Sequence, residues 1–239
     1  MRDSLPRSLL EKYEVHSFRN AAIVLGQALA DDFDEIAEAL ARFNLTTDMI
    51  RTAGGNESAI PKAFSEVLRP LGWQETKIQG DLLVRIESVQ GTGNARRKVT
   101  DTVTKENFLD GHKIDYVKNR IAFDLEWNSK DQTFDRDLYA FSAFFQCGII
   151  DAAVLVTRSA SLNPVFQDLG HSLTATGEVE TNRSGEPRLV KGKFGASTTW
   201  MGKLLYRLNA GRNGGCPVLA VGISPACISD LELGVQDDQ

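Results

Sequence analysis

The chain has 239 residues, of which 42% are hydrophobic and 25% are charged, and its formal net charge is −5. This composition is typical of a soluble globular protein, and the length favours one large domain. No apolar run reaches the roughly 18 residues that a membrane helix requires. The first residues carry charges and a proline rather than the apolar region of a secretory signal, so we expect a cytoplasmic protein. The few cysteines and histidines are scattered, which disfavours disulfides and a zinc site.

The first third of the chain is predicted to be mainly helical. Residues 20–42 repeat apolar side chains at helical spacing, which predicts one amphipathic helix with a break near Ala30 and Asp31. Residues 52–58 read as a loop that ends at Ser58, a suitable cap for the helix that follows. We therefore expect a single domain over 1–239 with an N-terminal helical part over about 1–72.

The middle of the chain predicts strands. Residues 75–90 have strand character, and the polar stretch 91–102 is expected to be an exposed loop. Residues 113–119 and 120–128 are predicted to pair as two strands joined by a tight turn near Lys118 and Asn119.

The last part of the chain alternates helices with covered strands. Near-continuous apolar runs at 150–159 and 216–223 predict strands that are buried on both faces. The helices expected around them span 134–148, 163–170 and 197–211, with Gly148 and Gly211 as stop signals, Ser197 or Thr198 as the cap of the last, and a long polar loop at 171–197. The order of elements predicts an α/β fold, with a central mixed β-sheet flanked by helices. The chain contains no dinucleotide-binding or P-loop motif.

Acidic side chains occupy the strand predicted at 120–128. Alternate residues of a strand face the same way, so Asp124, Glu126 and Asn128 project from one face, opposite the apolar Phe123 and Leu125. The predicted turn places Asp115 of the preceding strand beside this row. Clustered carboxylates repel one another, and Mg²⁺, which prefers oxygen ligands and is often shared with a substrate phosphate, relieves the repulsion. The competing interpretation is a polar, exposed edge strand.

The segment "IDYVKNRIAFDLEWN" resembles the active-site hairpin of the PD-(D/E)xK nuclease superfamily and, within it, the BglII group of Type II restriction endonucleases. That group carries an Asp, eight residues, an acidic residue, one residue, and then Gln or Glu; Asp115, Asp124 and Glu126 match this spacing. The later "ASTTWMGK" resembles a Ser-Thr-Thr-aromatic segment of the same family, and the resemblance extends over about 110–225. It implies a restriction endonuclease-like core, and a Mg²⁺-dependent nuclease with Asp115, Asp124 and Glu126 as metal ligands.

The third catalytic residue departs from the superfamily pattern, in which it is usually a lysine. In one register it is Glu126, which would orient the attacking water or accept its proton. In an alternative register Glu126 is a metal ligand, and Asn128 is the third residue, with Lys130 just beyond it.

Basic residues are concentrated away from the acidic strand. Between 181 and 213 there are seven basic residues and one acidic residue, and a second basic cluster spans 96–98. Lys and Arg contact phosphates or guanine, and a helix start with free amides holds a phosphate. The candidate DNA-binding residues are therefore Arg96, Arg97, Lys193, Ser197, Thr198, Thr199, Lys203 and Arg212. A solvated charged surface and ordinary helix capping are the competing interpretations.

The resemblance also implies partners. It predicts a homodimer on a palindromic site in double-stranded DNA, with an interface from the helix at 134–148 or the N-terminal helix, and a companion DNA methyltransferase that protects host DNA. Two other functions stay open: a repair or structure-specific nuclease of the superfamily, and a DNA-binding module that has lost its chemistry.

Overall fold

The computed structural model describes residues 4–52, 58–110 and 112–231. A six-stranded mixed sheet has the strand order β1-β8-β7-β6-β5-β2, and β3 and β4 form a separate pair. The strands of the sheet are β1 (Tyr13–Phe18), β8 (Val218–Ile223), β7 (Ala152–Arg158), β6 (Ile121–Glu126), β5 (Lys113–Lys118) and β2 (Gln74–Lys77). β6, β7 and β8 run parallel, whereas β1, β5 and β2 are antiparallel to their neighbours, so the prediction of a mixed α/β sheet is confirmed. β1, at one edge, was not predicted.

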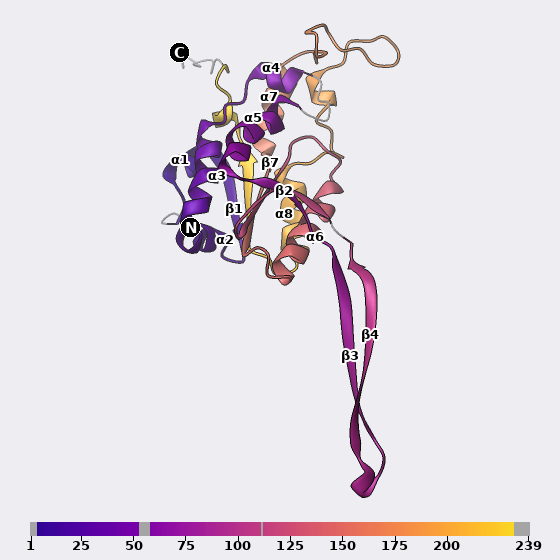
Figure 1. Cartoon of the computed structure of the whole chain (residues 1–239). Coiled ribbons are helices and arrows are strands. Elements are labelled where there is room, and N and C mark those ends of the chain that lie inside the picture. The colour runs from indigo at the N-terminus through magenta and orange to yellow at the C-terminus, as the bar shows by residue number, and fades with distance from the viewer. Residues whose placement is uncertain (1–3, 53–57, 111, 232–239) are drawn as a thin grey trace.

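Helices cover both faces of the sheet (Figure 1). On one face, apolar side chains from the N-terminal helices pack on Ile121, Phe123 and Leu125 of β6. On the other, α6 and α8 pack on Ala122 of β6 and on β7 and β8. The helices are α1 (Arg7–Lys12), α2 (Ala21–Ile23), α3 (Ala30–Arg42), α4 (Thr47–Arg51), α5 (Ala59–Leu68), α6 (Thr133–Gln146), α7 (Asn163–Asp168) and α8 (Met201–Asn209).

The predicted helix boundaries are mostly confirmed. The break near Ala30 falls at Leu29, between a π-helical turn (Val24–Ala28) and α3. Ser58 is the N-cap residue of α5, although its side chain makes no capping hydrogen bond. The loop predicted before it lies partly outside the described residues. None of the described helices is both long enough and apolar enough to cross a membrane.

The prediction for the start of α8 is wrong. The helix begins at Met201 after Trp200, so neither Ser197 nor Thr198 caps it. Thr199 is buried and exchanges hydrogen bonds with Ser129 in the segment that follows β6. Residues 197–199 are therefore held against residues 129–131, which follow β6. These three hydroxyl residues do not present helix amides to a ligand.

A long two-stranded arm projects from the body of the protein (Figure 1). β3 (Gly80–Gln90) and β4 (Arg97–Leu109) pair antiparallel along their length. The predicted loop at 91–102 is therefore wrong beyond Arg96, because its second half belongs to β4. The alternating valines and threonines of this segment have high strand propensity, and each meets a partner on β3.

The turn between β5 and β6 is tied to the N-terminal helices. Lys118, at the end of β5, donates hydrogen bonds to both carboxylate oxygens of Glu35 on α3, each at 2.7 Å. Glu35 also accepts a 2.8 Å hydrogen bond from the indole of Trp73, whose side chain is buried. This shared acceptor connects helix α3, β2 and the β5–β6 turn, and so positions the hairpin that carries the acidic residues.

Candidate active site

The predicted β5–β6 hairpin is confirmed. Tyr116 pairs with Phe123 and Lys118 with Ile121, and Asn119 takes a positive φ of 46° in the turn. Continuing this register by one residue sets Asp115 opposite Asp124. The alternation along β6 is also as expected, since Phe123 and its apolar neighbours lie in one core cluster and the acidic residues face the other way.

The hairpin brings one exposed and two buried carboxylates together. Asp115 is exposed, whereas Asp124 and Glu126 are 3% and 6% exposed. The side chain of Asp124 accepts a 2.9 Å hydrogen bond from the amide of Leu125. The exposed-edge interpretation is thus wrong, because β6 is a central strand covered on both sides.

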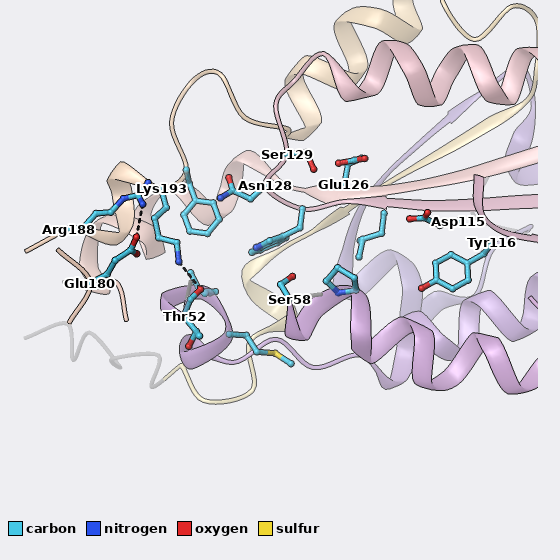
Figure 2. Close-up of a pocket in the computed structure, with 16 residues that line it drawn as sticks. Thr52, Ser58, Asp115, Tyr116, Glu126, Asn128, Ser129, Glu180, Arg188 and Lys193 are labelled. Carbon is cyan, nitrogen blue, oxygen red and sulfur yellow. Dashed lines mark hydrogen bonds and ion pairs between the residues drawn. The ribbon is translucent and has the colours of Figure 1, made fainter. Parts of the chain in front are cut away.

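Asp115 and Glu126 line a cavity of about 550 Å³, together with Tyr116, Asn128 and Ser129 (Figure 2). The far side of the cavity carries Lys193 and Arg188 from the long polar loop, and Arg188 is paired with Glu180 at 2.8 Å. The cavity therefore has acidic side chains at the end of the acidic strand and basic side chains on its far side.

Two residues of α6 complete the cluster and were not predicted as part of it. Asp137 is buried, and Arg136 donates hydrogen bonds to it and, at 3.2 Å, to Glu126. The sequence did contain a signal for Asp137: it falls on the same helical face as Phe134 and Phe141, which are buried. Two other carboxylates near this cluster have different partners: Asp131 pairs with Lys203, and Asp135 pairs with Arg207 and Arg212.

Burial and mutual repulsion raise the pKa values of this cluster. The pKa of Asp124 lies well above its usual value because the side chain is buried and then because Asp137, Asp115 and Glu126 are close. Burial also raises the pKa of Glu126, against the opposing hydrogen bond of Ser129 and the charge of Arg136. Burial and the charge of Glu126 raise the pKa of Asp137 to about 8.

The donor set has the chemistry of a cation site. Among the side chains that the structure describes, no three His, Cys, Asp or Glu residues are already arranged as a metal site. Arg136 forms ion pairs with both Glu126 and Asp137. One oxygen of Asp137 is buried without a hydrogen-bond partner. Clustered carboxylates with raised pKa values and an unpaired oxygen are groups that a hard divalent cation satisfies, so the residues fit Mg²⁺.

The free energy of unfolding in EDTA is expected to fall as pH rises from about 4 to 8. The folded-state pKa of Asp137 is about 8, above the reference value of 3.8. The folded protein therefore binds the additional proton, and its stabilising effect disappears as pH rises through the folded-state pKa. Urea unfolding at pH 5 and pH 8 checks this with Asp137→Asn, which should gain stability relative to wild type mainly at pH 8. An equal difference at both values would contradict the assignment.

Most predicted DNA-binding residues of the C-terminal half have partners within the protein. Lys193 donates hydrogen bonds to the carbonyl oxygens of Arg51 and Thr52, the latter drawn in Figure 2. Lys203 lies 3.3 Å from Asp131, and Arg212 is paired with Asp135. Ser197 is exposed, whereas the hydroxyl of Thr198 bonds to Gly195 and Arg158.

Arg96 and Arg97 lie far from this region, at the tip of the β3–β4 arm. Both are exposed, as is Lys98 beside them.

Comparison with protein families gives a match to a restriction endonuclease family. Residues 13–223 match the family model described as restriction endonuclease BglII/BglIII, which covers most of the chain and includes the acidic hairpin. A search of curated proteins found no match.

Proposed function

The chain belongs to the BglII/BglIII family of restriction endonucleases, and from this premise we propose that it cuts double-stranded DNA at a short palindromic sequence in a Mg²⁺-dependent reaction. Membership makes it a DNA nuclease, a hydrolase of the Type II restriction class. The observation that supports this proposal is the β5–β6 hairpin: Asp115 and Glu126 line the cavity, and continuing the register of the hairpin sets Asp124 opposite Asp115 on the adjacent strand.

Asp115 and Asp124 are the proposed cation ligands, and Glu126 is proposed to contact the same cation. A bound Mg²⁺ lowers the pKa of its water and polarises the phosphoryl oxygen. The chain itself supplies the rigid framework: β6 lies between β5 and β7, and the hydroxyl of Thr157 donates a 2.8 Å hydrogen bond to the carbonyl of Glu126, which holds the end of the strand.

Glu126 is the residue proposed to take a proton from the attacking water or to orient it. Its raised pKa improves its ability to accept a proton, and Arg136 at 3.2 Å favours the ionised form that a base requires. Asn128 is the alternative third residue. It lines the same cavity just beyond the end of β6, and its side-chain oxygen is buried without a hydrogen-bond partner.

We propose that the arm contacts the DNA backbone through its tip. Arg96, Arg97 and Lys98 form a basic cluster at the end of the arm, and among the described residues none of the three is in an ion pair. Ser197, Lys193, Lys203 and Arg212 stay candidates near the body, although the three basic residues would have to exchange an internal partner for a phosphate.

The triple substitution Arg96→Gln, Arg97→Gln and Lys98→Gln is expected to weaken DNA binding at every sequence. Each phosphate contact that is lost lowers the slope of log affinity against log salt by about 0.9, so the triple variant should lose about 2 to 3 units of slope. Binding assays at several salt concentrations, in Ca²⁺ or EDTA, measure this. A control that removes three exposed charges from the helices, Arg7→Gln, Arg42→Gln and Lys62→Gln, should keep the wild-type slope. Equal slopes in all three proteins would contradict the arm's role.

A homodimer is proposed because a two-fold protein matches a palindromic site. The two predicted interface helices offer little apolar surface for it, since most apolar residues of α3 and α6 are buried in the core of this chain and Tyr139 of α6 is an exposed exception. Sedimentation of the protein with and without DNA gives the oligomeric state, and a monomer in both conditions would contradict the proposal.

The function is tested by digesting unmethylated DNA with the purified protein in Mg²⁺ and in EDTA. The proposal expects discrete fragments in Mg²⁺ alone, with the same short palindrome at every sequenced end, and protection of that sequence by a companion methyltransferase. Cleavage without a common sequence would indicate a repair or structure-specific nuclease. Binding without cleavage would indicate a DNA-binding module of the same fold.

A further inference from the structure

A buried arginine lies at the end of β7, outside the carboxylate cluster. Arg158 is 2% exposed, and its guanidinium lies 5.6 Å and 5.5 Å from the ring centroids of Phe166 and Phe194. The two rings stack on each other with centroids 4.0 Å apart. The aromatic contacts hold the planar side chain in one orientation.

Arg158 lacks a counter-ion. Its guanidinium bonds to neutral oxygens, at 2.8 Å to the hydroxyl of Thr198 and at 3.3 Å to the side chain of Asn163, and its Nε has no hydrogen-bond partner. Within the described part of the chain no carboxylate lies within 4.0 Å of it. The other buried arginine, Arg207, is by contrast paired with Asp135. Burial lowers the pKa of Arg158 to about 10, so the group is still charged at neutral pH. An unpaired buried charge is costly unless a ligand neutralises it.

The guanidinium opens on a second cavity, of about 350 Å³. Lys191 and Lys203 also line this cavity, and among the described residues no Asp or Glu does. Lys191 is exposed, and Lys203 is partly neutralised by Asp131 at 3.3 Å. The cavity therefore presents three cationic side chains, one of which is buried and oriented in advance. Arginine in such a setting binds phosphate through two parallel hydrogen bonds.

The second cavity lies at the same edge of the sheet as the acidic cluster. Thr157, the residue before Arg158, pairs with Glu126, and Phe194 lines both cavities. The hydroxyl residue that Arg158 contacts, Thr198, bridges to Lys130 just beyond β6. A DNA strand with one phosphate at the carboxylates has further phosphates on either side, and this cavity lies at the same end of β6 and β7 as the carboxylates.

We propose that this cavity is a phosphate-binding site, with Arg158 as its buried ligand and Lys191 and Lys203 at its mouth. Its occupant is a phosphate of the DNA strand flanking the cleaved bond. That source rests on the proposed function, whereas the capacity to bind phosphate does not.

Two variants test the site. Arg158→Met removes the charge and keeps an apolar side chain of similar reach between the two phenylalanines; it should fold at least as stably as wild type in phosphate-free buffer. Lys191→Gln changes an exposed residue and should leave the fold intact. It therefore still tests the site if Arg158→Met does not fold. Arg42→Gln, on α3 and in neither cavity, is the control for net charge.

The first measurement is the unfolding temperature in EDTA with inorganic phosphate against sodium chloride at equal ionic strength. Wild type and Arg42→Gln should show a saturable rise in phosphate, because a ligand that binds only the folded state stabilises it. The rise should be absent in Arg158→Met and smaller in Lys191→Gln.

The second measurement is DNA affinity in EDTA or Ca²⁺. Arg158→Met should lower this affinity by about 10- to 100-fold, and Lys191→Gln should lower it by a few fold.

The outcomes separate the sources of phosphate. Loss of both phosphate stabilisation and DNA affinity supports the proposal. Loss of the phosphate effect with unchanged DNA affinity overturns DNA as the source and leaves a site for free phosphate. A rise of equal size in all proteins, or no rise in wild type together with unchanged DNA affinity, overturns the site itself. If wild type cleaves no DNA but still shows an Arg158-dependent phosphate effect, the proposed function fails while the site stands.

Discussion

Replacing Asp124 with asparagine is expected to reduce DNA cleavage by about 10³-fold or more while DNA binding is retained. Asp124 is buried between β5 and β7 and is surrounded by three other carboxylates, and its proposed role is to hold the cation that neutralises this cluster. Asparagine keeps the shape and still accepts the amide of Leu125. The substitution also removes a negative charge that is disfavoured by burial and by neighbouring carboxylates. The variant should therefore unfold at a higher temperature than wild type in EDTA.

The matched control for Asp124→Asn is Asp151→Asn. Asp151 lies just before β7, where it pairs with Arg120 on the surface. Loss of an exposed pair has little effect on stability and should leave cleavage unchanged. Single-turnover cleavage, gel-shift binding in Ca²⁺ and thermal unfolding of the three proteins give the comparison. Asp124→Asn with more than a tenth of wild-type cleavage would contradict the role of this residue.

Glu126→Gln is expected to lower cleavage by on the order of 10²-fold or more, whereas Asn128→Ala is expected to lower it by less than 10-fold. This difference follows from the first register, in which Glu126 orients the attacking water or accepts its proton. Under this register the rate of wild type should also rise with pH as Glu126 loses its proton, and Glu126→Gln should lose that dependence. Burial raises the pKa of Glu126, which places the change above the usual range of a glutamate.

The alternative register reverses the order for Asn128. If Asn128 is the third residue, Asn128→Ala should reduce cleavage as much as Glu126→Gln does. The double variant should then cleave no more slowly than either single variant. Single-turnover rates of both variants and of the double variant decide between the registers. Gln146→Ala, a change of an amide side chain on α6 that contacts only Ser142 in its hydrogen bonding, serves as the control for loss of an amide.

The sequence predicted the acidic hairpin because its signals are local. Strict alternation along 121–127 assigned the apolar side chains to one face, and Lys118 with Asn119 identified the turn, so the register that joins Asp115 to Asp124 followed. The mixed sheet followed from the apolar runs that became β7 and β8.

Features that depend on tertiary contacts were not predicted. The arm was missed because Val99, Thr100 and Val103 lie among polar residues and pair with β3 without a core beneath them. The predicted cap of α8, Ser197 or Thr198, was wrong because residues 197–199 pair with residues 129–131 beyond β6, and the helix begins only at Met201. Arg158 carried no local signal at all, since its significance lies in the absence of an acidic neighbour, which only the folded chain defines.

The position of the bound cation on the polypeptide can be measured by metal-directed cleavage. Fe²⁺ in place of Mg²⁺, with ascorbate and peroxide, generates radicals that cut the polypeptide next to the bound metal, and mass spectrometry of the fragments maps the cuts. If the carboxylate cluster holds the cation, cuts are expected within 113–118 and 121–129, excess Mg²⁺ should suppress them, and Asp124→Asn should abolish them. Cuts confined to other segments, or an unchanged pattern in Asp124→Asn, would show that the carboxylate cluster does not hold the cation.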